Sequence, residues 1–422
     1  MSEIIKYILN LSLLTIFFLI IQNNPVEAKL IKVGQKEAIK SLKEAVKVSL
    51  DGDQILLKEG TYKEGNILIN KKISITGENN PVLDGEYIHE IFTIKSDNVS
   101  IKNITFKNSG ISNIKDLAAI KIYGSKNCLI ENNKLFDTFF AIYLSDSEKC
   151  FIKNNKIAGK AKTESSSANA IHIWKSNNIT IKNNDISGHR DGIYFEFVKD
   201  SIITNNISTN NIRYGLHFMF SDGNDYINNS FIKNGAGVAV MYTKNIKMLN
   251  NKFENNWGSA SYGLLLKEIS KSEIKDNFFN KNTVGIYMEG SNRIDFRNNN
   301  LINNGKALRI ASSCDSNKFS YNNFIRNSFD ITTNASNTSV TSNIFEKNYW
   351  DKYKGYDLNK DKIGDIPYRP VSIFSMIVEK IPHAIILLRS LLVDILDVSE
   401  KVMPVFIPKT IIDEKPLMVI RK

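Results

Sequence analysis

The amino-acid sequence predicts an all-β protein whose chain winds into a parallel β-helix, a solenoid with about 22 residues in each coil. Three observations lead to this fold. About fifty of the 422 residues are asparagine, several times ordinary usage. Asparagine pairs recur at a nearly constant spacing, and short segments between them alternate apolar and polar residues. A unit of this length is too short for a pair of helices, but it fits three short strands joined by bends.

The overall composition excludes several other classes of protein. Hydrophobic residues make up 42% of the chain and charged residues 23%, so the chain is too apolar to be disordered. Eight prolines and three cysteines exclude a collagen-like fibre and a disulfide scaffold. The formal net charge of +11 suits solubility or attraction to a membrane surface. Because an exported protein meets no nucleic acid, we expect no nucleic-acid partner.

Residues 1–28 have the pattern of a signal peptide. An apolar run at 8–21 follows Lys6, and the segment Val26, Glu27 and Ala28 offers a small-residue cleavage site. The run is short for a spanning helix, and no later stretch reaches about 18 apolar residues. An uncleaved anchor and a buried helix are the alternatives. The sequence predicts cleavage after Ala28 and a mature protein that works outside the cytoplasm.

Residues 29–348 are predicted to form the solenoid together with a short helix that caps its first coil. The capping segment, residues 36–50, carries apolar side chains at helical spacing, namely Ala38, Ile39, Leu42, Ala45 and Val46. A helix there would protect the open edge of the first coil from pairing with other chains.

The asparagine pairs mark the bends of the solenoid. They begin at residues 132, 154, 183, 205, 228, 250, 276, 298 and 322, with aspartate in the first place at 276. Each is expected to stack on its equivalent about 4.8 Å away and to pair its amide along the solenoid axis. One strand per coil opens with a small residue, at 141, 170, 192, 215, 237, 263, 285 and 307. The first and third positions after it point inward, because side chains alternate along a strand.

The outward positions of this strand carry unusual side chains. The second position reads Tyr143, His172, Tyr194, His217, Ala239, Leu265 and Tyr287, and the fourth reads Ser145, Trp174, Glu196, Met219, Met241, Lys267 and Glu289. Met219 and Met241 are one coil apart, about 5 Å, and His217 is about 7 Å from Met219 along its strand. Thioether and imidazole ligands favour Cu(I) over calcium or magnesium. The predicted metal ligands are His217, Met219, Met241, Glu196, His172 and His189.

The residues alone leave this assignment open. The methionines and their aromatic neighbours Phe197 and Phe220 would equally form an apolar patch covered by a loop or a partner. His189 lies in the bend before Gly192, where it would either reach the same face or belong to a hydrogen-bonded turn.

Cys128 and Cys150 are 22 residues apart and therefore occupy the same inward position on adjacent coils. In an oxidising compartment this spacing allows a disulfide, and two stacked buried thiols are the alternative.

Residues 349–370 are predicted to form a loop rich in Asp and Asn that caps the last coil. Oxygen-bearing side chains alternate in it as they do in calcium loops, and the candidate calcium ligands are Asp357, Asn359, Asp361, Ile363 and Asp365. The loop lacks the glycine and the final glutamate of such loops, so a turn rich in side-chain hydrogen bonds is the alternative.

Residues 371–422 are predicted to form an amphipathic helix and an extended basic tail. The apolar residues Ile381, Ile385, Leu388, Leu392 and Ile395 recur at helical spacing, so this segment should lie against a surface and not span a membrane. The prolines at 404, 408 and 416 favour an extended tail.

Several runs of the sequence resemble the NosD family, periplasmic maturation factors of nitrous oxide reductase. The runs are residues 189–197, 213–220, 235–242 and 285–293, together with 348–351 and 368–370. The resemblance covers most of the mature chain. It implies a right-handed β-helix in the periplasm that is associated with the inner membrane through an ABC transporter.

The resemblance also implies partners and a role. The expected partners are the permease and the ATPase of the transporter, nitrous oxide reductase as the client, and a copper chaperone. The expected role is to deliver or insert copper or sulfur for the copper centres of the client, without catalysis. It supports copper handling at His217, Met219 and Met241, and it assigns the C-terminal segment to docking on the permease at the membrane surface.

Two other classes of function compete with this one. A carbohydrate-active enzyme, such as a polysaccharide lyase, hydrolase or epimerase, is built on the same fold. Its site would need paired carboxylates, and Glu196 and Glu289 are four coils apart, roughly 19 Å, too far to act together. Only Arg190, Asp191 and Glu196 would form a catalytic group. A purely structural solenoid is the third class.

Overall fold

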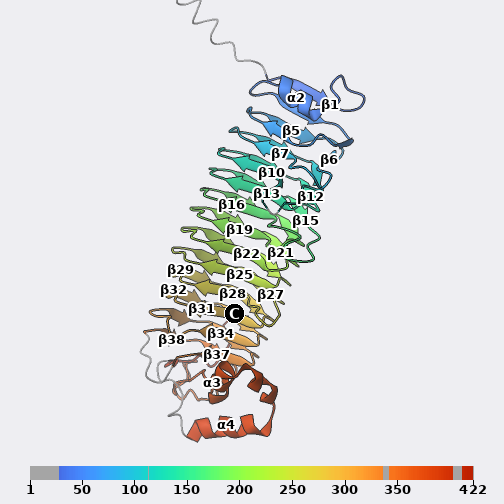
Figure 1. Cartoon of the computed structure of the whole chain (residues 1–422). Coiled ribbons are helices and arrows are strands. Elements are labelled where there is room, and N and C mark those ends of the chain that lie inside the picture. The colour runs from blue at the N-terminus through green and yellow to red at the C-terminus, as the bar shows by residue number, and fades with distance from the viewer. Residues whose placement is uncertain (1–27, 113, 336–341, 403–410, 422) are drawn as a thin grey trace, which may run out of the picture.

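The computed structural model describes residues 28–112, 114–335, 342–402 and 411–421 as a right-handed parallel β-helix with helices at its two ends (Figure 1). The predicted signal peptide therefore lies outside the described residues, apart from Ala28. Each coil contributes one strand to each of three parallel sheets. Among the described residues, no helix is long and apolar enough to cross a membrane.

The three sheets, named A, B and C here, run the length of the solenoid. Sheet A consists of β1 (Leu30–Val33), β2 (Gln54–Leu57), β5 (Ser74–Gly77), β8 (Ser100–Lys102), β11 (Leu129–Glu131), β14 (Phe151–Lys153), β17 (Thr180–Lys182), β20 (Ile202–Thr204), β23 (Asp225–Ile227), β26 (Lys247–Leu249), β29 (Ser270–Lys275), β32 (Asn292–Arg297), β35 (Lys318–Ser320) and β38 (Ile344–Glu346). Sheet B consists of β3 (Thr61–Tyr62), β6 (Val82–Asp84), β9 (Thr105–Lys107), β12 (Lys134–Phe136), β15 (Lys156–Ala158), β18 (Asp185–Ser187), β21 (Ile207–Thr209), β24 (Ser230–Ile232), β27 (Lys252–Glu254), β30 (Phe278–Asn280), β33 (Asn300–Ile302), β36 (Asn323–Ile325) and β39 (Tyr349–Trp350). Sheet C consists of β4 (Ile67–Ile69), β7 (Phe92–Ile94), β10 (Ala118–Tyr123), β13 (Phe140–Ser145), β16 (Ile171–Trp174), β19 (Ile193–Glu196), β22 (Tyr214–Met219), β25 (Ala236–Met241), β28 (Leu264–Lys267), β31 (Val284–Glu289), β34 (Lys306–Ile310) and β37 (Phe329–Thr333).

The asparagines stack as the sequence predicts, and the bend between sheets A and B shows how. Its ladder runs through Asn133, Asn155, Asn184, Asn206, Asn229, Asn251, Asn277, Asn299, Asn322 and Asn348. At each step the backbone N–H and the side-chain amide both donate to the next oxygen, as from Asn251 to Asn277 at 2.8 and 3.1 Å. The residue before the ladder position has a left-handed backbone, with φ 56° at Asn228 and 55° at Asn250 in successive coils.

A second asparagine ladder lies at the bend after sheet B. It runs through Asn211, Asn234, Asn256, Asn282, Asn304 and Asn327. This ladder was not part of the expected pattern, although 210–211, 255–256 and 303–304 are also asparagine pairs in the sequence. Buried aliphatic and aromatic side chains fill the space between the three sheets.

The predicted N-terminal cap is the helix α2 (Leu42–Val48), shorter than the 36–50 segment expected. Ser41 begins it, because its hydroxyl accepts from the backbone N–H of Glu44 at 3.2 Å. Leu42, Ala45 and Val46 are buried against the first coil. The solenoid begins with β1, which precedes the cap and pairs with β2 in parallel.

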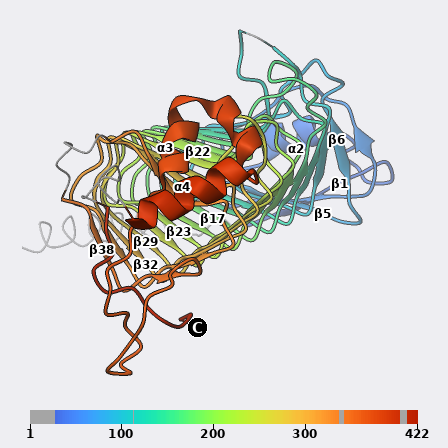
Figure 2. The same cartoon turned by 90° about the horizontal axis from the view of Figure 1, so that it is seen from below.

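Three helical segments follow the last coil: α3 (Ile373–Lys380), η1 (Pro382–Leu387) and α4 (Leu391–Val402). Figure 2, seen from below, shows them at the C-terminal end of the solenoid. Phe374 and Val378 of α3 and Val393 of α4 pack on Phe329 of β37. Much of their remaining apolar surface is exposed, at Ile381, Ile385, Ile386, Leu387, Leu391, Leu392, Ile395 and Val398.

The expected extended tail is wrong for residues 411–421, which return to the solenoid. Asp413 and Leu417 form bridges to Phe345 and Tyr349, so the segment adds a partial coil. Asp413 is fully buried and takes the next place of the asparagine ladder, because the backbone N–H and the side-chain amide of Asn348 both donate to it at 3.0 Å. Pro404 and Pro408 lie outside the described residues.

Candidate functional site

The outward columns predicted on sheet C have the predicted register. His172 pairs with Tyr194, which pairs with His217 on the next strand. In the neighbouring column Glu196 pairs with Met219, and Met219 with Met241. Strands β19, β22 and β25 therefore place one imidazole and two thioethers on adjacent coils of one sheet face.

This face is less open than the sequence suggests. Inserted segments at 109–112, 114–117 and 159–170 run over it, and Phe140, Tyr143 and Ala168 form a small apolar cluster there. A cavity of about 470 Å³ remains beneath them, and we call it the sheet C cavity. Its polar lining consists of Ser112, Asp116, Glu164, Ser165, Ser167, Asn169, His172, Arg190, Asp191, Tyr194, Glu196, Arg213 and His217.

His217 lies at the wall of the sheet C cavity and is only 7% exposed. Its ring meets those of Tyr194 and Tyr214, with ring centres 5.1 and 4.8 Å away. Neither ring nitrogen has a hydrogen-bond partner among the described residues. Burial, reinforced by the positive charges of Arg213 and Arg190, lowers the pKa of His217 to about 4. The imidazole is therefore neutral at physiological pH, as a metal ligand must be.

His172 is held more firmly than His217. Its ring is stacked between Tyr143 and Tyr194, with centres 4.6 and 4.8 Å away, and its Nδ1 lies 2.9 Å from the amide nitrogen of Asn169. Burial and the charge of Arg190 lower the pKa of His172 to about 3. One of its nitrogens is thus already engaged within the protein.

Met219 and Met241 are half-buried and lie beside a strip of aromatic rings. Each ring belongs to the residue that follows Glu196, Met219 or Met241, namely Phe197, Phe220 and Tyr242. The ring centre of Phe220 lies 5.3 Å from that of Phe197 and 5.1 Å from that of Tyr242, and the rings are stacked. All three have left-handed backbones with φ between 51 and 56°, which bulky side chains rarely adopt. The thioethers and this strip form one surface outside the sheet C cavity.

The prediction that His189 shares this face is wrong. His189 is fully buried, and its backbone N–H donates to the side-chain oxygen of Asn211 at 3.1 Å, so it occupies the first place of the second asparagine ladder. Its Nδ1 lies 3.2 Å from the hydroxyl of Ser167. The bend carries its ring beneath the insertion at 159–170 and not into the cavity.

The structure brings together only part of the predicted ligand set. His172, Glu196 and His217 line the sheet C cavity, whereas Met219 and Met241 lie on the adjoining column. Glu196 accepts a hydrogen bond from the hydroxyl of Tyr194 at 3.3 Å. Among the described residues, no three His, Cys, Asp or Glu side chains converge as a metal site. A copper site here would depend on the thioethers together with His217.

Cys128 and Cys150 are free buried thiols in the structure. Each sulfur lies near backbone carbonyls of the bend, at 3.4–3.7 Å. A hydrogen bond to Cys150 and burial raise the pKa of the Cys128 thiol. The disulfide remains a prediction for oxidising conditions, since the two residues lie on adjacent coils.

The candidate calcium loop forms the alternative turn rich in side-chain hydrogen bonds. Asp357 accepts from the backbone N–H groups of Asp361 and Lys362, and Asp365 accepts from that of Leu358. Asn359 and Asp361 likewise accept from backbone N–H groups two residues later. The oxygens of the loop thus satisfy its own backbone, and calcium is unsupported.

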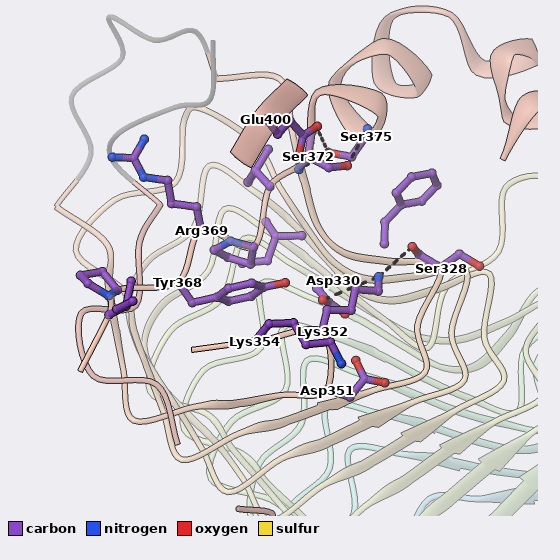
Figure 3. Close-up of a pocket in the computed structure, with 16 residues that line it drawn as sticks. Ser328, Asp330, Asp351, Lys352, Lys354, Tyr368, Arg369, Ser372, Ser375 and Glu400 are labelled. Carbon is purple, nitrogen blue, oxygen red and sulfur yellow. Dashed lines mark hydrogen bonds and ion pairs between the residues drawn. The ribbon is translucent and has the colours of Figure 1, made fainter. Parts of the chain in front are cut away.

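A second cavity, of about 720 Å³, lies between the last coils and the C-terminal helices (Figure 3). Lys352 points between Ser328 and Asp330 and donates to the carbonyl of Ser328 at 3.0 Å. Asp330 is almost fully buried, and burial raises its pKa to about 6. Its carboxylate lies 3.7 Å from the Lys352 ammonium. The sequence does not indicate that Asp330 and Lys352 lie together, because they come from separate coils and no short motif contains both.

Comparison with known proteins gives one family and a set of relatives. The family model described as periplasmic copper-binding protein (NosD) matches residues 153–355. A probable ABC transporter binding protein NosD of Pseudomonas aeruginosa is 24% identical over 388 residues, 87% of this chain and 89% of that protein. A protein of the same description from Stutzerimonas stutzeri is 26% identical over 197 residues, 43% of this chain. The match spans only 44% of the Stutzerimonas protein.

Solved structures with a similar fold include two carbohydrate-active enzymes. The catalytic unit of an α-1,3-glucanase from Streptomyces thermodiastaticus superposes with a TM-score of 0.61 at 12% identity, over 78% of this chain and 70% of that one. The A-module of the mannuronan C-5 epimerase AlgE6 from Azotobacter vinelandii gives 0.51 at 10% identity, over 72% and 94%. At such low identity these likenesses establish the fold alone.

Proposed function

We propose that the chain is a member of the NosD family of periplasmic copper-binding proteins and acts as an accessory protein in the maturation of nitrous oxide reductase. In this role it handles copper or sulfur species for the copper centres of the enzyme, together with an ABC transporter. The observation that carries the proposal is the family match at residues 153–355, which contains every residue of the proposed copper face. The role requires no catalytic residues, and the relatives are named as binding proteins.

Copper would be carried as cargo by Met219, Met241 and His217. The two thioethers are one coil apart, about 4.8 Å, and both are half-buried, so a Cu(I) ion at the surface can reach both. His217 supplies a neutral imidazole without a competing hydrogen bond. Three soft or borderline ligands on a rigid sheet suit a site that must release its ion to a client.

The test is an anaerobic Cu(I) titration of the mature protein against a competing chelator. We expect Met219→Ala/Met241→Ala to weaken the affinity at least tenfold relative to the unmodified protein. Met418→Ala, which removes a thioether from the distant end of the solenoid, is the matched control and should bind as the unmodified protein does. Equal affinity of all three proteins would refute the copper face.

The C-terminal helices are proposed to dock on the transporter permease at the membrane surface. The support is the apolar surface of η1 and α4, where Ile386 is 87% and Leu391 73% exposed. Deleting the segment would also remove Asp413 and the partial coil, so substitutions are the cleaner test. We expect Ile386→Asp/Leu391→Asp to abolish co-purification with the transporter, while Leu358→Asp, on the exposed loop, retains it. Full recovery of the complex with the double variant would refute docking.

A carbohydrate-active enzyme remains the competing proposal, favoured only by the shared fold. Glu196 and Glu289 are separated by four coil steps, about 19 Å, beyond the separation of hydrolytic carboxylate pairs. Release of sugar from acidic glycans by the purified protein would reverse the ranking.

A further inference from the structure

We propose that the sheet C cavity binds a small oxyanion, the carboxylate or sulfate group of a polar molecule, between the guanidinium groups of Arg190 and Arg213 and the imidazole of His217. The site would be separate from the thioethers of Met219 and Met241, and its existence does not depend on copper. The inference therefore goes beyond the proposed function.

Arg190 and Arg213 form a pair of guanidinium groups on successive coils. The backbone N–H of Arg213 donates to the carbonyl of Arg190 at 2.8 Å, so the two residues are stacked in register. Their contacts to carboxylates among the described residues are long: Arg190 Nε lies 3.6 Å from Asp191, and Arg213 Nε lies 3.7 Å from Glu164. Both exceed normal hydrogen-bond length. One terminal nitrogen of Arg190 donates to the side-chain oxygen of Asn169 at 3.0 Å. The remaining N–H groups of the two adjacent guanidinium groups match an oxyanion, which can accept hydrogen bonds from both.

Two buried polar groups in the cavity also lack partners. The Nε of Arg190 and both ring nitrogens of His217 are buried without a hydrogen bond among the described residues. Leaving such a group unpaired costs about 1–3 kcal/mol, so unpaired groups that line one cavity point to a ligand. An oxyanion would accept from the Nε of Arg190 and from the one N–H of the neutral His217 ring.

Among the described residues that line the cavity, Arg190 and Arg213 are the cationic side chains, and they face four carboxylates, those of Asp116, Glu164, Asp191 and Glu196. An oxyanion would therefore bind at the two guanidinium groups and not elsewhere in the cavity.

The size of the cavity indicates that the ligand is larger than a bare ion. A volume of about 470 Å³ accommodates a molecule of sugar size. Glu196 and the hydroxyl of Tyr194 also line this cavity, and they would accept hydrogen bonds from hydroxyl groups. The chemistry fits a hydroxylated carboxylate, and an inorganic oxyanion would use the same two arginines.

The test is isothermal titration calorimetry of the copper-free mature protein at constant ionic strength, with sulfate, glucuronate and glucose as probes. We expect glucuronate to bind and glucose not to bind, and Arg213→Gln to weaken anion binding at least tenfold. Arg293→Gln, which removes an exposed arginine from sheet A, is the matched control and should change nothing. His217→Phe keeps the aromatic packing and should weaken binding as well.

The outcomes separate this proposal from the copper proposal. Met219→Ala/Met241→Ala should bind the anion normally even though it loses copper. Binding of sulfate alone supports a site for inorganic oxyanions, and binding of glucuronate supports a hydroxylated acid. Equal binding of glucose and glucuronate, equal affinity of Arg213→Gln and the unmodified protein, or no binding of either anion at millimolar concentration would overturn the proposal.

Discussion

At the scale of single residues, the two asparagines of a pair meet different physical requirements of the bend. Asn250 has a left-handed backbone, which asparagine tolerates better than most residues, whereas Asn251 is buried and links three coils through its amide. Asn251 accepts from Asn229, donates to Asn277 and donates to the carbonyl of Tyr226. The amide therefore satisfies polar groups that a buried bend would otherwise leave unpaired.

His189 occupies a ladder position with a titratable side chain, so the stability of the protein should depend measurably on pH through this residue. Burial lowers the pKa of His189 to about 4, below its value of about 6.5 in an unfolded chain. Between these values the unfolded state binds more protons, so the stabilisation is complete above pH 6.5 and is lost as the pH falls toward 4. At pH 5 the loss is about 2 kcal/mol.

We expect His189→Asn to resist urea better than the unmodified protein at pH 5, and to unfold at a similar urea concentration at pH 7.5. Asparagine would extend the ladder that continues at Asn211 and would carry no proton. His383→Asn, at an exposed position, should leave the pH dependence unchanged. An identical pH dependence for His189→Asn and the unmodified protein would contradict the assignment.

Which residues share a face was predictable from the sequence, but how deeply they are buried was not. The spacing placed His172, His217, Met219 and Met241 in the correct columns because register follows directly from a period of two. The inserted segments at 109–112, 114–117 and 159–170 fold back over the column that contains His172 and His217. The repeat period does not predict where an inserted segment will fold. For the same reason the sequence did not indicate that His189 is buried beneath one of them.

At the scale of elements, one carboxylate adds to the apolar packing that attaches the C-terminal helices to the solenoid. Glu379 of α3 accepts from the ammonium of Lys306 at 2.8 Å and from Nε of Arg309 at 2.7 Å, both on β34, and it is nearly buried. Arg309 also covers the ring of Tyr287, 4.4 Å from its centre. Glu379 is the shared partner of both cations, so removing its charge leaves Lys306 and Arg309 without their counter-charge.

We expect Glu379→Gln to lower the free energy of detaching α3 and α4 from the solenoid by about 1–3 kcal/mol. The reason is that the two cations lose their counter-charge in a partly buried place. Hydrogen exchange of the α3 amides should quicken, while the amides of β22 keep their protection. Glu346→Gln, which breaks an exposed ion pair with Lys318, is the control and should change stability by less than about 0.5 kcal/mol. Unchanged exchange in α3 would show that apolar packing on Phe329 suffices.

At the scale of the whole molecule, the two ends of the solenoid determine whether the protein stays monomeric or associates through unpaired strand edges. Every interior strand pairs on both sides, so unpaired edges arise only at the first and last coils. The amphipathic spacing predicted the cap α2 because its buried residues are local in sequence. At the other end a cap was predicted at 349–370, but the closure by residues 411–421 was not, since Asp413 joins Asn348 across 65 residues and a single aspartate carries no periodic signal.

Asp413 should therefore control both the stability and the association of the molecule. Besides Asn348, it accepts from the indole N–H of Trp350 at 3.0 Å and from the backbone N–H of Lys347 at 3.1 Å. Asp413→Ala would leave these buried donors unpaired at about 1–3 kcal/mol each, release residues 411–421 and expose the edges of β38 and β39. We expect a lower urea midpoint and concentration-dependent self-association in analytical ultracentrifugation. Asp413→Asn keeps the acceptor used at every earlier rung of the ladder and should stay close to the unmodified protein, so association of both variants alike would refute the role of the ladder in closing the solenoid.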